Sequence, residues 1–430
     1  MELVKYPSRK DWKSLLKRPA IDSLLLEEIV KPILEDVKKN GDSAIRKYAL
    51  QFDKADLVSL EVSQEEINSA ESKLSEELKN AIQIAKNNIE KFHLSQKEEV
   101  KFIETTKGVN CWRKSVGIEK VGLYIPGGSA PLFSTVLMLG VPAKLAGCKE
   151  IILCTPSNPA CEINAAILYT AKLVGITKIF KTGGAQAIAA MAYGTETIPQ
   201  VYKIFGPGNQ YLTCAKQLVN KEGIAIDMPA GPSEVAILAD KTCISEFVAA
   251  DLLSQAEHGI DSQTILVSDD ENVIQKINLE LEKQLNQLSR KEIAKEALKN
   301  SKAILVSSLE EGINLLNEYA PEHLIIACEN EENLVGKVIN AGSVFLGNYS
   351  CESAGDYASG TNHTLPTNGN AKAYSGISLD SFVKKITFQK LSKEGIKNIG
   401  NTVELMAEAE GLDAHKNAVS VRVKDLGFRI

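Results

Sequence analysis

The sequence predicts an α/β protein built on two parallel sheets. Short β-branched runs alternate with helical segments from residue 121 to 232, and the same rhythm resumes from 233 to 378. Strands that alternate with helices at this spacing form βαβ units, in which the strands are parallel. A chain of 430 residues with 44% hydrophobic residues is also too long for one ordinary core, so we expect at least two domains.

The chain before this rhythm is predicted to be mainly helical. Residues 1–20 form an N-terminal arm, and the stretch from Asp22 to Lys97 repeats apolar residues at helical spacing. Ser63 and Glu66 match a capping box at the start of a second helical segment. The apolar positions of the first helix are Leu24, Leu25, Ile29, Ile33 and Val37.

One α/β domain is predicted to span 121–232. Its strands are expected at Val121–Ile125, Glu150–Cys154, Lys178–Phe180 and Val201–Phe205. Its helices are expected at Thr135–Ala146, Ile163–Leu173, Ala185–Tyr193 and Asn209–Val219. The proline- and glycine-rich segment 225–232 is predicted to be the crossing into the other domain.

The other α/β domain is predicted to be discontinuous and to combine 21–120 with 233–378. Its strands are expected at Val235–Leu238, Thr264–Val267, Ala303–Val306, Leu324–Ala327 and Ser343–Leu346. The tail, 379–430, returns to a helical pattern and ends in the strand-like run Val419–Val423. We treat this tail as a small appended domain.

Charge and composition argue against several classes of partner. The net charge of -6 and the pI near 5.7 do not favour the clustered basic surface of nucleic-acid binding proteins. The amino terminus shows no secretory signal and no apolar stretch is long enough for a membrane span, which predicts a cytoplasmic protein with a small-molecule substrate. The eight cysteines include no C-x-x-C pair, so neither a thiolate zinc cage nor a disulfide framework is predicted.

Glycine-rich turns follow three of the predicted strands and precede predicted helices. They are Tyr124–Ser129, Thr182–Gln186 and Phe205–Gln210. In an open parallel sheet, ligands bind beyond the carboxyl ends of the strands, where glycine admits a close backbone approach and a helix amino terminus favours an anion. None of the turns matches the G-x-G-x-x-G fingerprint, and no acidic residue stands at the customary distance. Each turn alone is also typical of a tight βα connection, but three together favour a ligand cleft.

Most of the histidines lie in polar, glycine-rich runs beside carboxylates or carboxamides. These are His258, His323, His363 and His415. Imidazole titrates near neutrality and is the commonest metal ligand, so the runs indicate a metal site, a general base, or both. Gln255 and His258 stand three apart, as two ligands on one helical face would, although the same spacing is typical of a capped helix end. The fifth histidine, His93, ends a charged helix and is expected to be solvated.

Glu322 and His323 are the candidate catalytic pair. On an extended strand their side chains would point to opposite faces, so both reach one cleft only from a turn, which Pro321 favours at the strand entry. A histidine beside a carboxylate is suited to take a proton from an alcohol, and the glutamate is suited to orient water. An exposed strand start with charged residues explains this pair equally well. Asp356 and His363 flank a polar loop that suits ligands or substrate contacts.

Taken together, these runs resemble the histidinol dehydrogenase family over nearly the whole chain. The matching motifs are Gly122–Gly128, Gly183–Ala187, Gly206–Asn209, Met228–Glu234, Gln255–Gly259, Pro321–Leu324 and Gly355–His363. The resemblance implies the last step of histidine biosynthesis, in which NAD oxidises L-histidinol twice, through an enzyme-held aldehyde, to L-histidine. It also implies two incomplete Rossmann-like domains and an intertwined homodimer, to whose partner subunit the tail contributes.

The resemblance further implies roles for individual residues. One zinc ion per subunit would be bound by Gln255, His258 and Asp356 of one subunit and His415 of the other. The implied NAD contacts are Tyr124, Gln186 and Asn209, and the implied substrate contacts are Ser233, Gln255, His258, His323, Asp356, Glu410 and His415. His323 would be the general base of the first oxidation, and Glu322 would activate the water that attacks the aldehyde.

Other interpretations stay open on the sequence alone. In a zinc hydrolase, Glu322 or His323 would activate a metal-bound water and the glycine turns would bind nothing. A dehydrogenase of a different amino alcohol and an inactive dimeric scaffold are the remaining alternatives. Cys111 and Cys148 have no neighbouring histidine to make either a thiolate, so we expect both to serve packing rather than a thioester mechanism.

Overall fold

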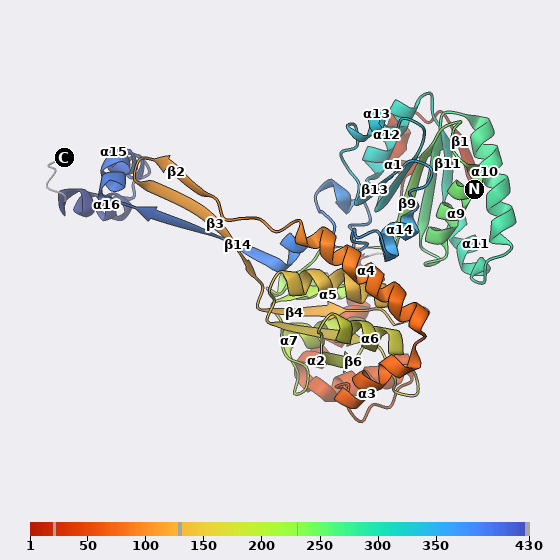
Figure 1. The fold of residues 1–430 in the computed structure, drawn as a ribbon, viewed down its shortest axis with the longest axis horizontal. Helices are drawn as coiled ribbons and strands as arrows, with labels where there is room; N and C mark the ends of the chain where they lie inside the picture. The colour runs from red at the N-terminus through yellow and green to blue at the C-terminus, as the bar shows by residue number, and fades with distance from the viewer. Residues whose placement is uncertain (20–22, 128–130, 230, 426–430) are drawn as a thin grey trace. The chain divides into compact units, whose positions relative to one another are not determined.

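The computed structural model describes residues 1–19, 23–127, 131–229 and 231–425, and in it the chain forms two compact units (Figure 1). The larger unit takes in 1–95 and 118–382, and the smaller unit joins 96–117 to the chain from residue 383 onward. This division differs from the predicted domain boundaries. The two predicted α/β domains share one unit, and a segment assigned to the N-terminal region belongs with the tail.

Sheet A, in the larger unit, is parallel throughout, as the sequence predicts. Its strands run in the order β1-β11-β10-β9-β12-β13. Their bounds are β1 (Glu2–Lys5), β9 (Glu234–Ala239), β10 (Gln263–Ser268), β11 (Lys302–Leu305), β12 (His323–Ala327) and β13 (Ser343–Leu346). The predicted N-terminal arm therefore supplies an edge strand, and the direction of strand addition reverses between β9 and β12.

Helices cover both faces of sheet A because alternate strand residues point to opposite sides. One face packs against α9 (Ser245–Ala256), α10 (Glu271–Leu285) and α11 (Lys291–Lys299). The other packs against α1 (Trp12–Leu15), α12 (Leu309–Tyr319) and α13 (Glu332–Val335). The central strands of the sheet are buried on both faces and are mostly apolar, which is why the sequence predicts them.

Sheet B, also in the larger unit, is the second predicted parallel sheet. Its strand order is β6-β5-β4-β7-β8. The strands are β4 (Lys120–Tyr124), β5 (Glu150–Thr155), β6 (Lys178–Lys181), β7 (Lys203–Phe205) and β8 (Ala225–Ile226), and the helices between them are α5 (Phe133–Leu145), α6 (Ala165–Leu173), α7 (Gly184–Tyr193) and α8 (Gln210–Lys221). Strand addition reverses between β4 and β7, and such a switch point is where open α/β sheets bind ligands.

The N-terminal helices pack on sheet B, whereas the sequence predicts that they belong to the domain of sheet A. Helix α2 (Ser23–Tyr48) contacts α7 and α8, and α4 (Glu76–Leu94) contacts α5. Between them lie a π-helical turn (Ala49–Asp53) and α3 (Gln64–Ser69). The predicted capping box of Ser63 and Glu66 is confirmed at the start of α3.

Helix α2 exists as predicted, but its buried face is shifted. Between residues 24 and 40 its buried residues are Leu26, Val30, Leu34 and Val37. Three of the predicted positions, Leu24, Leu25 and Ile29, are exposed. The leucine-rich run offers two overlapping apolar stripes, and the contact with α7 and α8 selects between them.

The smaller unit is built on antiparallel sheet C, with strand order β14-β3-β2 (Figure 1). Its elements are β2 (Phe102–Thr106), β3 (Val109–Gly117), β14 (Val383–Leu391), α15 (Lys393–Ala409) and α16 (Asp413–Asp425). Two tail predictions are wrong here: 383–391 is a strand, and Val419–Val423 belongs to a helix. The helix dipole of α16 is complemented by Asp413 in the first turn and by Arg422 and Lys424 in the last turn. The alternating valines suggested a strand and obscured this helical signal.

Helix α14 (Glu352–Tyr357) follows β13, and short 3-10 helices lie at Arg9–Asp11, Ala70–Lys73, Asn370–Lys372 and Leu379–Phe382. Gly128 and Ser129 of the first glycine turn and Ala230 of the predicted crossing lie outside the described residues. None of the helices among the described residues combines the length and the apolar composition that a membrane crossing demands.

Candidate active site

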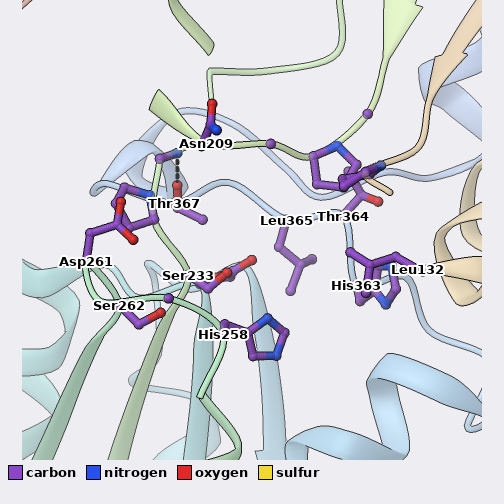
Figure 2. A pocket seen from close by; sticks show the side chains of 18 of the residues that line it. Leu132, Asn209, Ser233, His258, Asp261, Ser262, His363, Thr364, Leu365 and Thr367 are labelled. Atoms are coloured by element: carbon purple, nitrogen blue, oxygen red, sulfur yellow. Dashed lines mark hydrogen bonds between the residues drawn. The ribbon is translucent and has the colours of Figure 1, made fainter. Parts of the chain in front are cut away.

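A cavity of about 210 Å³, which we term the first cavity, collects residues from both switch points. Pro126 and Asn209 come from the segments after β4 and β7, and Ser233 and Glu322 come directly before β9 and β12. Figure 2 shows the side chains of Ser233 and His258 near one another on its wall. The first cavity therefore lies at the carboxyl ends of sheet B strands and at the amino ends of sheet A strands.

His323 stands at the first position of β12, beside the first cavity, and is buried. Its Nδ1 lies 3.2 Å from the carbonyl oxygen of Glu234 on β9, a group that can only accept a hydrogen bond. The proton of a neutral His323 is therefore held on Nδ1. This leaves Nε2 as the basic nitrogen, and that buried atom finds no hydrogen-bond partner among the described residues.

Three carboxylates surround His323, and together the four residues form what we term the His323 cluster. Glu322 Oε2 and Glu352 Oε1 lie 3.8 Å and 3.7 Å from Nδ1, and Asp356 Oδ1 lies 3.5 Å from Nε2. Glu322 is buried with His323, so the interpretation of this pair as an exposed strand start is wrong. Glu322 directly precedes β12, and its Oε2 accepts a hydrogen bond of 2.9 Å from the Glu234 N–H.

Burial and charge compete within the His323 cluster. Burial alone would lower the pKa of His323, but Glu352, Glu322 and Asp356 outweigh it and raise that pKa well above its usual value. Burial raises the pKa of Glu322 to about 8 and that of Glu352 well above its ordinary range, against the pull of His323. Burial also acts to raise the pKa of Asp356, but the imidazoles nearby hold it below its usual value. Excess buried carboxylate of this kind favours a bound cation.

Glu352 is the member of the cluster that sequence reasoning missed. It begins α14 (Glu352–Tyr357), four residues before Asp356, so both carboxylates lie on the same side of one short helix. The same spacing argument that singled out Gln255 and His258 would have found this pair. With its amide oriented so that both atoms are satisfied, buried Gln255 donates to Glu352 Oε1 and accepts from the Glu234 N–H at 2.9 Å.

The donor atoms fit a divalent metal ion. One ligand atom each from His323, Glu352 and Asp356 lie within 4.8 Å of one another, and Nε2 of His323 is unpartnered among the described residues. Nitrogen and oxygen donors without a thiolate suit zinc and the other first-row divalent ions. Of the predicted ligands, the structure brings Asp356 into this group and places Gln255 in hydrogen-bond contact with it.

The remaining histidines have different surroundings. His258 follows the last turn of α9 and lines the first cavity, and much of its side chain is exposed there. The protein atoms packed around its ring lower its pKa, and the charge of Asp356 acts in the opposite direction. His363 lines the first cavity, with Nε2 3.0 Å from Thr135 Oγ1 and Nδ1 2.9 Å from the Asp356 carbonyl oxygen. The prediction for His93 is wrong: it is fully buried, because its side of α4 faces α5, and its Nδ1 lies 2.9 Å from the Ile89 carbonyl oxygen.

The third glycine turn is held by a buried ion pair. Lys216 of α8 forms an ion pair with Asp227, and the side chains of both residues are almost fully buried. Lys216 also donates a hydrogen bond of 3.0 Å to the Gly206 carbonyl oxygen. Asp227 in turn accepts a 2.8 Å hydrogen bond from the Gly206 N–H. A Cβ at Gly206, whose φ is +144°, would lie 2.3 Å from the Tyr124 carbonyl oxygen, so only glycine fits this approach of the turn to the end of β4.

A second cavity, of about 550 Å³, contains the three predicted cofactor contacts. Tyr124, Gln186 and Asn209 all line it, and the N–H of Gly184 donates to the Tyr124 hydroxyl at 3.3 Å. Pro126, Gly208 and Asn209 line the first cavity as well, so the two cavities adjoin. The second cavity thus lies beyond the carboxyl ends of sheet B strands and beside the amino termini of α7 and α8, where a dinucleotide phosphate is favoured.

Two predicted site residues lie in the smaller unit. Glu410 caps the end of α15, and His415 stands in the first turn of α16; both side chains are exposed. The structure brings the other predicted site residues into the larger unit.

A comparison with known protein families finds one continuous match that includes all of the motifs described above. The family model for histidinol dehydrogenase covers residues 16–423. The chain belongs to the histidinol dehydrogenase family. A histidinol dehydrogenase of Bacteroides thetaiotaomicron is 60% identical over 99% of this chain and all of its own, and one of Escherichia coli O6:H1 is 50% identical over 97% of this chain and 98% of its own.

A solved structure of the histidinol dehydrogenase family agrees with the fold. The crystal structure of the histidinol dehydrogenase from Elizabethkingia anophelis superposes with a TM-score of 0.97, at 60% identity, over 100% of this chain and 99% of its own. The α/β architecture predicted from the sequence and the resemblance to this family are therefore both confirmed.

Proposed function

We propose that the protein is a cytoplasmic, NAD- and zinc-dependent L-histidinol dehydrogenase that carries out the last step of histidine biosynthesis. The names of its relatives suggest the substrate. The observation that carries the proposal is the junction of the two cavities at Asn209. The His323 cluster lies beside the first cavity, and the second cavity is large enough for a nucleotide. This arrangement suits hydride transfer, because the nicotinamide must reach the carbon whose hydroxyl proton is removed. A hydrolase has no use for the second cavity.

Gln255, His258 and Asp356, with His415 of the partner subunit, are the proposed zinc ligands. The excess of carboxylate at the buried Glu352 and at Asp356 supports a cation beside Asp356, and His323 is not among the proposed ligands, which leaves its Nε2 for proton transfer. When bound, zinc would supply a fixed positive charge that orients a substrate through its nitrogen atoms. Ser233 and Glu410 are proposed as further substrate contacts; Ser233 lines the first cavity, which supports its assignment.

His323 and Glu322 divide the proton transfers between them. The carboxylate charge that raises the pKa of His323 would be offset by a cation bound beside Asp356, so that the imidazole is neutral before the reaction. His323, held through Nδ1 by the Glu234 carbonyl, then takes the alcohol proton at Nε2 as the carbon loses a hydride. Glu322 then removes a proton from the water that adds to the aldehyde, so that the resulting hydrate can lose the second hydride. NAD, bound at Tyr124, Gln186 and Asn209, would accept one hydride in each oxidation. Because the cluster is buried, the aldehyde is shielded from bulk water.

The proposal is tested by counting NADH. Metal-replete protein, excess NAD and a limiting amount of L-histidinol are expected to give two equivalents of NADH per substrate, read as near-ultraviolet absorbance, and L-histidine as product. No NADH would overturn the proposal and favour the hydrolase or the scaffold. Faster turnover of another amino alcohol would replace the substrate but keep the chemistry.

The shared site in a homodimer predicts a complementation result. The His258→Ala and His415→Ala chains, each expected to be inactive alone, are mixed, unfolded and refolded together. Random pairing should restore about a quarter of the wild-type activity, because half of the dimers are mixed and each mixed dimer has one intact site. Refolded His258→Ala alone is the matched control. No recovery in the mixture would mean that each site is built from one chain.

A further inference from the structure

We propose that Asp53 binds the hydroxyl groups of the adenosine ribose of the dinucleotide and thereby excludes a cofactor with a phosphate on that ribose. The inference rests on the proposed function and names the residue that would make the protein select NAD over NADP. A dinucleotide-binding sheet usually carries an acidic residue for this purpose at the end of its second strand. The sequence has no acidic residue at that distance. Asp53, in the π-helical turn that follows α2, supplies a carboxylate instead.

The position of Asp53 is the first support. It ends the π-helical turn Ala49–Asp53, and it lines the second cavity together with Tyr124, Gln186 and Asn209. Burial raises the pKa of Tyr124 to about 12, and the negative charge of Asp53 on the wall of the same cavity acts in the same direction. Asp53 does not line the first cavity. Since the nicotinamide must reach the first cavity, the part of the dinucleotide near Asp53 is the adenosine half.

The lack of a partner is the second support. No hydrogen bond or ion pair links the Asp53 carboxylate to any other residue that the structure describes, and burial alone raises its pKa, to about 6. A half-buried carboxylate without a donor is costly, and paired ribose hydroxyls would supply two donors. A phosphate at the same place would bring two negative groups together in a partly dehydrated cavity.

The apolar surroundings are the third support. Ile29 and Phe52 line the second cavity, and about half of each side chain is exposed. Phe52 stacks on Tyr48 through one ring face, with centroids 5.7 Å apart and an interplanar angle of 8°. Exposed apolar side chains beside an unpaired carboxylate match an adenine ring next to its ribose. This also accounts for Ile29, which the packing of α2 leaves exposed.

The test measures equilibrium binding to the metal-replete protein without L-histidinol, so that turnover does not enter. Wild type, Asp53→Asn and Asp56→Asn are titrated with NAD, NADP and NAD that lacks the 2′-hydroxyl of the adenosine ribose. Asp53→Asn is expected to weaken NAD binding about tenfold or more and to narrow the preference for NAD over NADP by a similar factor. Asp56 is exposed and does not line the cavity, so Asp56→Asn should leave both affinities unchanged.

The deoxy cofactor separates hydroxyl recognition from a general loss of charge. Wild type should bind it less tightly than NAD, whereas Asp53→Asn should bind the two alike, as a double-mutant cycle requires for two groups in contact. If Asp53→Asn bound NAD as tightly as wild type does, and NADP as tightly as wild type does, the inference would be overturned and the proposed function left intact. Failure of wild type to bind either dinucleotide would overturn both.

Discussion

Replacing His323 by asparagine is expected to lower kcat by about 10²–10⁴-fold, the usual contribution of a general base. Asparagine keeps a polar side chain of similar size but has no nitrogen that can take a proton. The buried Nε2 is poised for this role because the Glu234 carbonyl occupies Nδ1. Single-turnover kinetics with L-histidinol and NAD measure the effect on the first oxidation directly.

His93→Asn is the control for this experiment. It removes another buried imidazole, one that does not line either cavity, and so should lower the melting temperature while leaving kcat within severalfold of wild type. The metal content and NAD affinity of His323→Asn should also be preserved. An unchanged turnover in His323→Asn would remove His323 from the mechanism and revive the interpretation of the chain as a scaffold.

Replacing Asp356 by alanine is expected to empty the metal site. Removing a residue that only hydrogen-bonds to a metal ligand lowers metal affinity about 10–100-fold. Removing Asp356, which is a proposed ligand itself, should lower the zinc affinity at least as much. Asp356 is also the member of the cluster whose pKa is lowered, so it is the carboxylate most readily available as an anion. A competition titration of the metal-free variant with a zinc-binding dye measures the affinity, and activity at saturating zinc shows whether function returns.

Asp261→Ala is the matched control, because Asp261 lines the first cavity but is not part of the His323 cluster. Its zinc affinity should equal that of wild type. Glu352→Gln separates two roles of that residue: a smaller loss than in Asp356→Ala would mark Glu352 as the residue that positions Gln255. Full zinc binding by Asp356→Ala would contradict the proposed ligand set.

The sequence predicted the two parallel sheets because their central strands are buried on both faces and consist largely of apolar runs, whereas the partly exposed edge strands β1 and β8 were not predicted. Sheet C escaped prediction for the opposite reason. Strands β3 and β14 are largely polar and partly exposed, and they pair across more than 250 residues, so no local pattern distinguishes them from loops or helices. The buried face of α2 was misassigned since its partners, α7 and α8, are remote in the sequence.

Site residues were predictable where a motif carried them. Glu322, His323 and Asp356 came from such runs, and the structure brings all three together. Glu352 escaped because a glutamate at a helix start is ordinary on a surface, and only the packing of α14 against α9, with His323 beside it, buries the side chain. Asp53 was missed because it lies outside the sheet domain in which an acidic residue was sought.

The His323 cluster offers oxygen and nitrogen but no sulfur to a cation. Sites with nitrogen and oxygen donors bind first-row divalent ions in a general order of affinity and have little preference for one particular ion beyond that order. The ion recovered with the protein should therefore depend on the trace-element supply of the growing cell as well as on affinity. Cobalt, and still more manganese, binds such donors more weakly than zinc, so either ion should replace zinc only when the culture medium supplies it in large excess.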